Sequence, residues 1–393
     1  MKPELLAPAG DWAMLNAAVN AGADAVYFGV KDMNMRHSAR NFSIDDLKKI
    51  GKLNVKKYLA LNTVVFDDEL EDIKKVLQEA YSSNIDAVIC WDMSVLEIAK
   101  ELGLTVHLST QASVSNLKSL QFYEKYGVKR FILARELSLD QVKNIKSNSS
   151  AEIECFIHGA MCVSVSGRCF MSQFLDNKSA NCGKCFQPCR RPYIIKDKET
   201  GFELEVGDNY VLSPKDLCTM PFIDRLIESK IDALKIEGRS KTPEYVDAVV
   251  RAYRAAIDAH ENNELTEELK SSLTKDLAKA YNRSFSSGFY LGKPLNEWAS
   301  SEGNASEVKK IEVGKVTGYY GRSGVAAIRA ECEGFSVGDT LMVIGSTTGI
   351  VRQKVESIEL DKKQVSAINK GDWAGVKLGK LVRENDRVYK IIS

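Results

Sequence analysis

The sequence predicts an α/β fold, a TIM-like (β/α) barrel with a cysteine-rich insertion, followed by a small C-terminal all-β barrel. Two observations lead to this prediction. Short apolar runs alternate with longer amphipathic runs through the first two-thirds of the 393 residues, which indicates repeated βα units. After residue 308 the pattern changes to short alternating segments separated by Gly and Asp, which is typical of a small all-β domain.

Near-continuous apolar strands are typical of parallel sheets that are buried on both faces. Eight such strands fit a closed barrel. A doubly wound open sheet is the alternative, but it would carry a Gly-rich first turn, and Pro8-Ala9-Gly10-Asp11 is not one. The expected strands are Glu4–Ala7, Ala25–Gly29, Lys57–Asn62, Ala87–Trp91, Val106–Ser109, Arg130–Ala134, Glu152–Ile157 and Ala233–Ile236.

Several amphipathic runs between these strands begin at a capping Asp or Ser and end near Gly, as helix termini prefer. The expected helices are Asp11–Ala21, Ser43–Lys52, Asp68–Ser83, Ser94–Leu102 and Ser115–Tyr126, with two later ones at Pro243–Asn262 and Thr266–Tyr281.

Domain boundaries follow from composition. Small polar residues fill Ser300–Ser306, as in a linker. We therefore expect a barrel over 1–299, a linker over 300–307 and a C-terminal domain over 308–393. The strands expected in that last domain are Ile311–Val316, Gly324–Ile328, Thr340–Val343, Gln353–Ile358 and Ala374–Leu378.

Bulk composition predicts a soluble cytoplasmic protein, with 44% hydrophobic and 27% charged residues. No apolar stretch approaches the roughly 20 residues that span a bilayer, and no signal peptide is expected. A reducing compartment argues against structural disulfides. The net charge of +1 neither supports nor excludes an RNA partner.

Six of the nine cysteines lie within residues 155–189, and such density indicates a disulfide framework, a zinc site or an iron–sulfur cluster. Cys162, Cys169, Cys185 and Cys189 have the spacing C-x6-C-x15-C-x3-C. This spacing places four thiolates on two loops, and four thiolates are the usual ligands of a four-iron cluster.

Zinc is the main alternative to a cluster. Cys182 and Cys185 form a C-x2-C knuckle, which Cys155 or Cys162 would help to complete. Free thiols are the third interpretation. Cys218 is a further possible ligand, and a Cys–His nucleophile that uses His158 is formally open.

Polar residues recur where the expected strands end. Because barrel active sites gather at the C-terminal ends of the strands, this recurrence predicts one shared pocket. The residues are Asn34, Arg36, Asn62, Trp91, Asp92, His107, Gln111, Arg135, Glu136, His158, Glu237 and Arg239.

The stretch Glu154–Ser172 resembles the signature of peptidase family U32. The matching residues are Glu154, Phe156, Gly159, Cys162, Gly167, Cys169 and Ser172. The segments at 4–10, 23–27, 106–111, 235–239 and 282–292 resemble other blocks of that family. Together the resemblance covers roughly three-quarters of the chain.

The family name implies proteolysis, and a collagenase activity is attributed to some members. Other members take part in oxygen-independent hydroxylation of the tRNA wobble uridine to 5-hydroxyuridine, of ribosomal RNA or of ubiquinone precursors. The RNA branches are linked to prephenate, and a 4Fe–4S cluster held by four cysteines is implied. Those cysteines correspond to Cys162, Cys169, Cys185 and Cys189. The segment 185–193 and the C-terminal domain resemble the tRNA branch most.

We therefore expect a cluster-dependent tRNA hydroxylation enzyme. Arg36, Arg135 and Arg239 would bind the carboxylates of a small acid such as prephenate, with Asn62 and Gln111 as further substrate contacts. His107, His158 and Glu237 would handle protons.

A U32-type peptidase and a zinc-stapled RNA-binding module are the alternatives. In the C-terminal domain the candidate phosphate contacts are Arg322, Arg329, Arg352, Lys377, Lys380 and Arg383.

Overall fold

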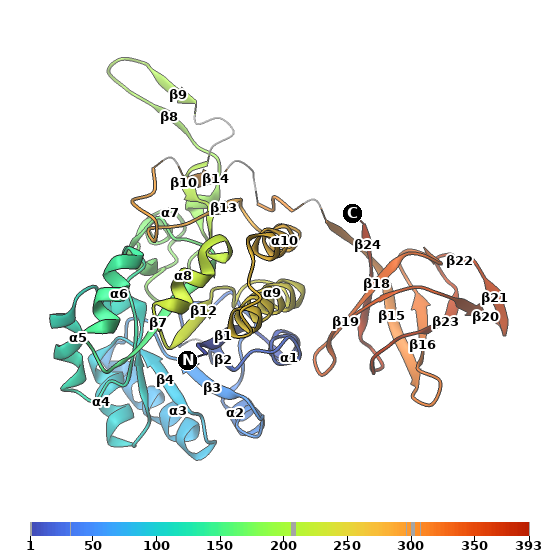
Figure 1. Ribbon diagram of the computed structural model, residues 1–393, viewed down its shortest axis with the longest axis horizontal. Coiled ribbons are helices and arrows are strands. Elements are labelled where there is room, and N and C mark those ends of the chain that lie inside the picture. The colour runs from blue at the N-terminus through green and yellow to red at the C-terminus, as the bar shows by residue number, and fades with distance from the viewer. Residues whose placement is uncertain are drawn as a thin grey trace.

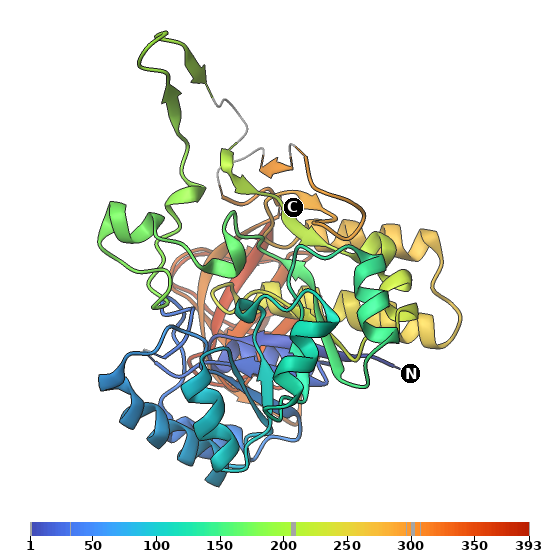
Figure 2. The same ribbon diagram turned by 90° about the vertical axis from the view of Figure 1, so that its left-hand side faces the viewer.

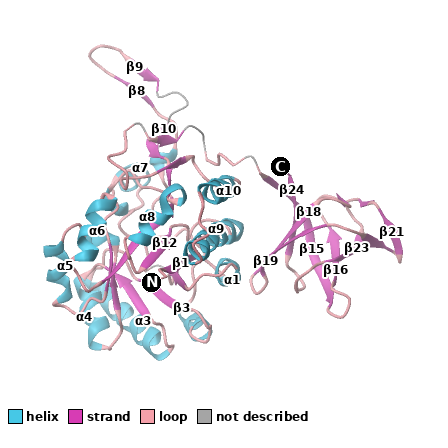
Figure 3. Ribbon diagram, in the orientation of Figure 1, coloured by secondary structure: helices cyan, strands magenta, loops and turns pink. Residues whose placement is uncertain are grey.

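The computed structural model describes residues 2–31, 33–205, 210–295, 297–299, 303–306 and 308–392. A barrel surrounded by helices forms the larger part, and a separate antiparallel β domain lies beside it (Figure 1). Secondary structure changes from mixed to all-β between the two, as Figure 3 shows. Residues 300–302 and 307 of the expected linker lie outside the described residues, so the domain boundaries stay predictions.

Eight parallel strands close the barrel in the order β1 to β7 and then β12, with β12 paired to both β7 and β1. This closure confirms the predicted barrel over an open sheet. The strands are β1 Glu4–Ala9, β2 Ala25–Phe28, β3 Lys56–Ala60, β4 Ala87–Cys90, β5 Val106–Leu108, β6 Arg130–Ile132, β7 Glu152–Gly159 and β12 Ala233–Ile236.

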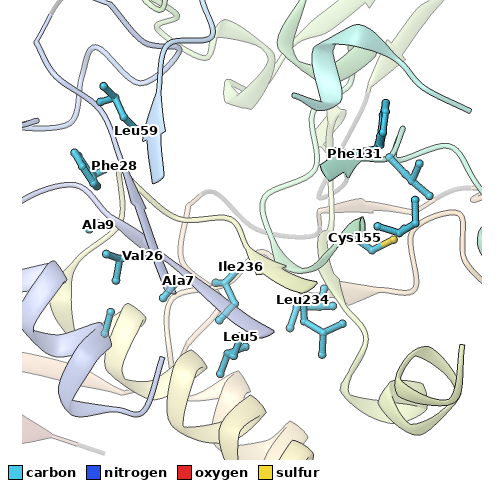
Figure 4. Close-up of a cluster of buried hydrophobic side chains, with 14 of the residues drawn as sticks. Leu5, Ala7, Ala9, Val26, Phe28, Leu59, Phe131, Cys155, Leu234 and Ile236 are labelled. Atoms are coloured by element: carbon cyan, nitrogen blue, oxygen red, sulfur yellow. The ribbon is translucent and has the colours of Figure 1, made fainter. Parts of the chain in front are cut away.

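Helices pack around the barrel. Helix α1 (Trp12–Asn20) begins at Asp11, whose side chain accepts a hydrogen bond from the Met14 amide at 2.9 Å. The outward side chains of the strands, such as Phe28 and Leu234, form the core beneath the helices (Figure 4). The other helices are α2 Leu47–Ile50, α3 Leu70–Ser82, α4 Met93–Glu101, α5 Leu117–Glu124, α6 Leu139–Ser147, α7 Met171–Asp176, α8 Ile223–Glu228, α9 Pro243–Glu261 and α10 Glu267–Ala278.

A buried charge network fills the N-terminal end of the barrel. Arg130 donates to Glu4 at 2.6 Å, and Lys235 donates to Glu154 at 2.7 Å. Arg130 also contacts Glu154 at 3.4 Å, which links the two pairs. Paired in this way, the buried charges compensate one another.

An insertion between β7 and β12 covers the open end of the barrel. It contains α7, the hairpin of β8 (Ile194–Lys196) and β9 (Glu203–Glu205), which projects from the body in Figure 2, and β10 (Tyr210–Pro214). Strand β11 (Asp216–Cys218) then pairs antiparallel with β7. The short strands β13 (Phe285–Ser286) and β14 (Trp298–Ala299) pair with β11 and β10.

The C-terminal domain is an eight-stranded antiparallel sheet around its own core, with a two-stranded β17–β22 pair. It docks on the barrel through α1, where Asn16 donates to the carbonyl of Ser346 at 2.7 Å and Ala17 packs on Met342. Its strands are β15 Lys309–Tyr320, β16 Val325–Ala330, β17 Phe335–Ser336, β18 Thr340–Gly345, β19 Gly349–Lys354, β20 Ile358–Leu360, β21 Lys363–Val365, β22 Ala367–Ile368, β23 Trp373–Lys377 and β24 Arg387–Ile392.

Candidate functional site

A cavity of about 260 Å³ lies at the C-terminal ends of the barrel strands, beneath the insertion. We call it the barrel-mouth cavity. Most of the site residues expected from the sequence line it. They are Arg36, Asn62, Gln111, Arg135, Glu237, Arg239, Cys162, Cys169, Cys185 and Cys189.

Glu237 follows β12 and carries the central negative charge of the cavity. Arg36 donates to its Oε1 through Nε at 3.1 Å and Nη2 at 2.9 Å. Burial alone would raise the pKa of Glu237, but the guanidinium groups of Arg36, Arg135 and Arg239 outweigh it and lower that pKa to about 2. Glu237 is therefore a carboxylate at neutral pH. A carboxylate with so low a pKa is a poor proton acceptor. Glu237 therefore acts here mainly as the negative charge that balances the arginines.

Two more guanidinium groups face the cavity with unused donors. Arg135 donates to the carbonyl of Ala160 at 2.8 Å and stacks on Phe156, but its Nε has no partner among the described residues. Arg239 likewise has an unpartnered Nη1 within the described part of the chain. Buried donors without partners are costly, and guanidinium groups bind carboxylates well. The cavity therefore suits a small anion.

Two side-chain amides form the polar wall between the arginines. Asn62 donates to Oε1 of Gln111 at 3.3 Å, and Gln111 donates to the backbone carbonyl of Asn62 at 3.2 Å. Trp91 donates to the same carbonyl at 3.1 Å. These bonds fix both amides at the ends of β3 and β5, where they can orient a bound molecule.

The four cysteines come from loops of the insertion that enter the cavity together. Backbone amides donate to two of the sulfurs, from Met171 to Cys169 and from Gln187 to Cys185, each at 3.3 Å. Gln187 adopts a positive φ of 54°, and this turn lies between the last two cysteines. Amide donors aimed at sulfur are a common feature around iron–sulfur clusters.

The thiols also lie within electrostatic reach of one another. Burial raises the pKa of Cys189, and the nearby Cys162, Cys185 and Cys169 raise it further. In the described part of the chain, no three His, Cys, Asp or Glu side chains stand close enough to hold a single metal ion. The thiolates of a four-iron cluster each bind a different iron, so they stand farther apart than the ligands of one ion.

The other cysteines of the insertion region lie elsewhere. Cys155 and Cys218 are buried in the packing around β7 and β11, and burial raises the pKa of each thiol. Cys182 is half-buried and does not line the barrel-mouth cavity. The cavity thus selects the same four cysteines as the sequence motif.

Both histidines expected in the pocket lie outside it, which corrects that expectation. His107 points into the barrel below the cavity, where its ring packs on Tyr58 with centroids 4.6 Å apart. Burial, with the charges of Arg130 and Lys235, lowers its pKa well below the usual value. Its neighbours on β5, Val106 and Leu108, face outward into the core beneath the helices. Because side chains alternate along a strand, His107 faces inward.

His158 faces the helices on the outside of the barrel. The pairing of β7 with β12 shifts between Lys235–Phe156 and Ile236–His158, so one extra residue reverses the alternation. The ring packs on Tyr253 of α9, with Nδ1 3.3 Å from the hydroxyl. Burial, with a smaller effect of Lys241, lowers the pKa of His158 to about 3. Neither histidine is placed to exchange protons with a ligand in the cavity.

Sequence reasoning missed Lys241, which lies beside the site. Its ammonium stands 3.4 Å above the Tyr281 ring. Burial lowers the pKa of Lys241 to about 7; Asp216 opposes this shift, whereas the nearby Arg283 and Arg190 act in the same direction as burial. Lys241 lies two residues beyond Arg239, in the loop after the last barrel strand. That position in the sequence could have marked it as a residue near the site.

The fold and the cavity define a class of protein: a (β/α)₈ barrel with an arginine-rich and cysteine-lined site at its mouth. The chain belongs to peptidase family U32, whose model matches residues 10–300.

Three relatives indicate the range of this family. The chain is 43% identical to an uncharacterized protease of Methanocaldococcus jannaschii and 40% identical to a collagenase of Porphyromonas gingivalis, each over 98% of this chain and 97% of the relative. It is 35% identical to the tRNA hydroxylation protein P1 of Bacillus subtilis, over 81% of this chain and 78% of the relative. None of the described helices has the length and apolar character to cross a membrane.

Proposed function

We propose that this protein is an iron–sulfur-dependent enzyme of tRNA modification that hydroxylates the wobble uridine to 5-hydroxyuridine. One observation carries the proposal: four cysteines line the same cavity as the buried carboxylate of Glu237 and the three arginines, Arg36, Arg135 and Arg239, that lower its pKa. The similarity to the tRNA hydroxylation protein P1 supports the choice of substrate.

Cys162, Cys169, Cys185 and Cys189 would hold a 4Fe–4S cluster. Such a cluster supplies one-electron transfer to a bound substrate. The amides of Met171 and Gln187 would stabilise negative charge on the sulfurs.

A small acid such as prephenate would bind beside the cysteines. The free donors of Arg135 and Arg239 would bind its carboxylate groups, and Arg36 would stay paired with Glu237. Asn62 and Gln111 would orient its polar groups.

The test is the nucleoside content of tRNA. Cells without their own tRNA hydroxylation proteins would receive the wild type, Cys185→Ala or Cys182→Ala, and mass spectrometry would measure 5-hydroxyuridine. We expect the wild type and Cys182→Ala to restore the nucleoside, because Cys182 does not line the cavity, and Cys185→Ala to fail. If both variants restored 5-hydroxyuridine equally, a cluster held by Cys185 would not be needed for the reaction.

A peptidase is the second candidate, because the relatives at 40% and 43% identity are named collagenase and protease. The cavity offers it little chemistry. In the described part of the chain no histidine lines the barrel-mouth cavity beside a thiol or hydroxyl. Cleavage of gelatin by the purified wild type, together with no modified nucleoside in tRNA, would favour the peptidase.

A further inference from the structure

A second and much larger hollow lies between the barrel and the C-terminal domain. We call it the interdomain cleft; its volume is about 1,410 Å³. Helices α9 and α10 and the loop after β12 form one wall, and strands β15 and β19 contribute to the other. Figure 1 shows the C-terminal domain on the side of α9 and α10.

The lining of this cleft is strongly basic, with eight Lys or Arg side chains and only three carboxylates. Six of these eight cations have a carboxylate at ion-pair distance, as in the pairs Lys279–Asp276 at 2.7 Å and Arg352–Asp247 at 2.6 Å. Lys241 and Lys309 have no carboxylate partner at ion-pair distance among the described residues. The surplus of positive charge lies inside a concave surface, where it attracts a polyanion most strongly.

The interdomain cleft opens directly onto the barrel-mouth cavity. Five residues line both: Arg36, Ser38, Ala160, Gln187 and Glu237. A chain lying in the cleft therefore passes the edge of the small cavity.

Size separates the roles of the two spaces. Small-molecule sites usually measure about 300–1,000 Å³, so the cleft exceeds that range and the 260 Å³ cavity lies just below it. We infer that the interdomain cleft binds the phosphate backbone of an RNA strand and directs one unstacked base into the barrel-mouth cavity. This inference rests on the proposed function and adds to it the path of the substrate.

The inference places phosphate contacts differently from the sequence-based expectation. Of the residues expected there, only Arg352 lines the cleft, and it is paired with Asp247. Arg329 instead packs over Trp373 at 5.3 Å, on strands that do not line the cleft. Lys377 and Lys380 are exposed and also lie outside the cleft. They therefore provide a matched control for any test of charge.

The experiment compares two double variants of the full-length protein. Lys279→Ala/Lys309→Ala removes two exposed cations from the cleft, and Lys377→Ala/Lys380→Ala removes two exposed cations elsewhere. Binding to unmodified tRNA is measured over a range of salt concentrations. Each lost phosphate contact on a single strand lowers the log–log salt slope by about 0.7. We expect the cleft variant to lose about 1.4 in slope and on the order of tenfold in affinity at 0.1 M salt, and the control to keep both.

Each outcome decides a separate point. If the wild type binds tRNA tightly and both double variants keep the same affinity, the cleft is not the RNA path. The proposed function is unaffected by that result. A loss confined to Lys377→Ala/Lys380→Ala also overturns it, because phosphate contacts then lie on the other face. A wild type that binds gelatin peptides but no tRNA overturns the proposed function together with the cleft inference.

Discussion

Arg36 and Glu237 form an ion pair, 2.9 Å between Nη2 and Oε1, where the barrel-mouth cavity meets the interdomain cleft. Arg36 comes from the loop after β2 and Glu237 from the end of β12, which are 201 positions apart. The pair therefore joins two distant strand ends of the barrel at the entrance of the candidate site.

Mutation of this pair should reveal strong coupling. Arg36→Met leaves the buried carboxylate of Glu237 without this partner, and Glu237→Gln leaves the one-third-exposed Arg36 unpaired, whereas the double variant removes both charges. We expect urea unfolding to give a coupling free energy of about 1–3 kcal/mol, so that the double variant is less destabilised than the sum of the single ones. Additive effects would contradict a structural role for the pair. Glu136→Gln, an exposed residue of the same cavity, is the control and should change stability little.

Iron content should separate two neighbouring cysteines. In protein purified without oxygen, Cys169→Ser should lose most of its iron and acid-labile sulfide, because Cys169 lines the cavity. Cys182→Ser should retain both. Stoichiometric zinc in the wild type would favour the zinc alternative, and equal iron loss in the two variants would contradict the choice of Cys169 over Cys182 as a ligand.

Lys241 should react unusually fast with amine-specific reagents. A lysine with a pKa of about 7 is about nine-tenths neutral at pH 8, whereas an ordinary lysine is under about 1% neutral there. Competitive acetylation followed by peptide mass spectrometry would measure both, with Lys377 as the reference. Arg283→Gln removes a nearby positive charge, so it should raise the pKa of Lys241 and slow the reaction at pH 8. Equal rates for Lys241 and Lys377 would refute the lowered pKa.

His158 should make the protein sensitive to acid. Its folded pKa of about 3 lies below the unfolded value of about 6.5, so the unfolded state binds more protons between these limits. Stability is therefore complete above pH 6.5 and falls as the pH drops toward 3. The wild type should therefore have a lower free energy of unfolding at pH 4.5 than at pH 7.5. We expect this difference to be about 2–3 kcal/mol smaller in His158→Gln. An unchanged difference would mean that His158 is not buried in its neutral form.

Periodicity was enough to predict every barrel strand, since parallel strands buried on both faces are continuous apolar runs. It also placed Arg36, Asn62 and Arg135 at strand ends, where they line the cavity. It failed for His158, because the register shift opposite Ile236 has no signal in single-sequence alternation. Strand β11 was missed because it follows no βα unit and begins with the polar Asp216, so the pattern that predicted the parallel strands does not include it.

The positions of Lys241 and of the interdomain cleft depend on contacts between segments far apart in sequence. Phosphate contacts in the C-terminal domain were expected from charge alone. Charge does not reveal which face of that domain turns toward α9, and the docking of β19 against α1 sets that orientation.

That docking has a consequence for the newly made chain. Asn16 and Ser346 are 330 positions apart, so the first helix leaves the ribosome long before its partner strand exists. Until the C-terminal domain is made, the face of α1 around Ala17 is exposed to water. All eight barrel strands are present once residue 236 has emerged from the ribosome. Folding of the barrel thus precedes assembly of the interdomain cleft, and a chain interrupted between the two stages would hold a complete cavity with one wall of its entrance missing.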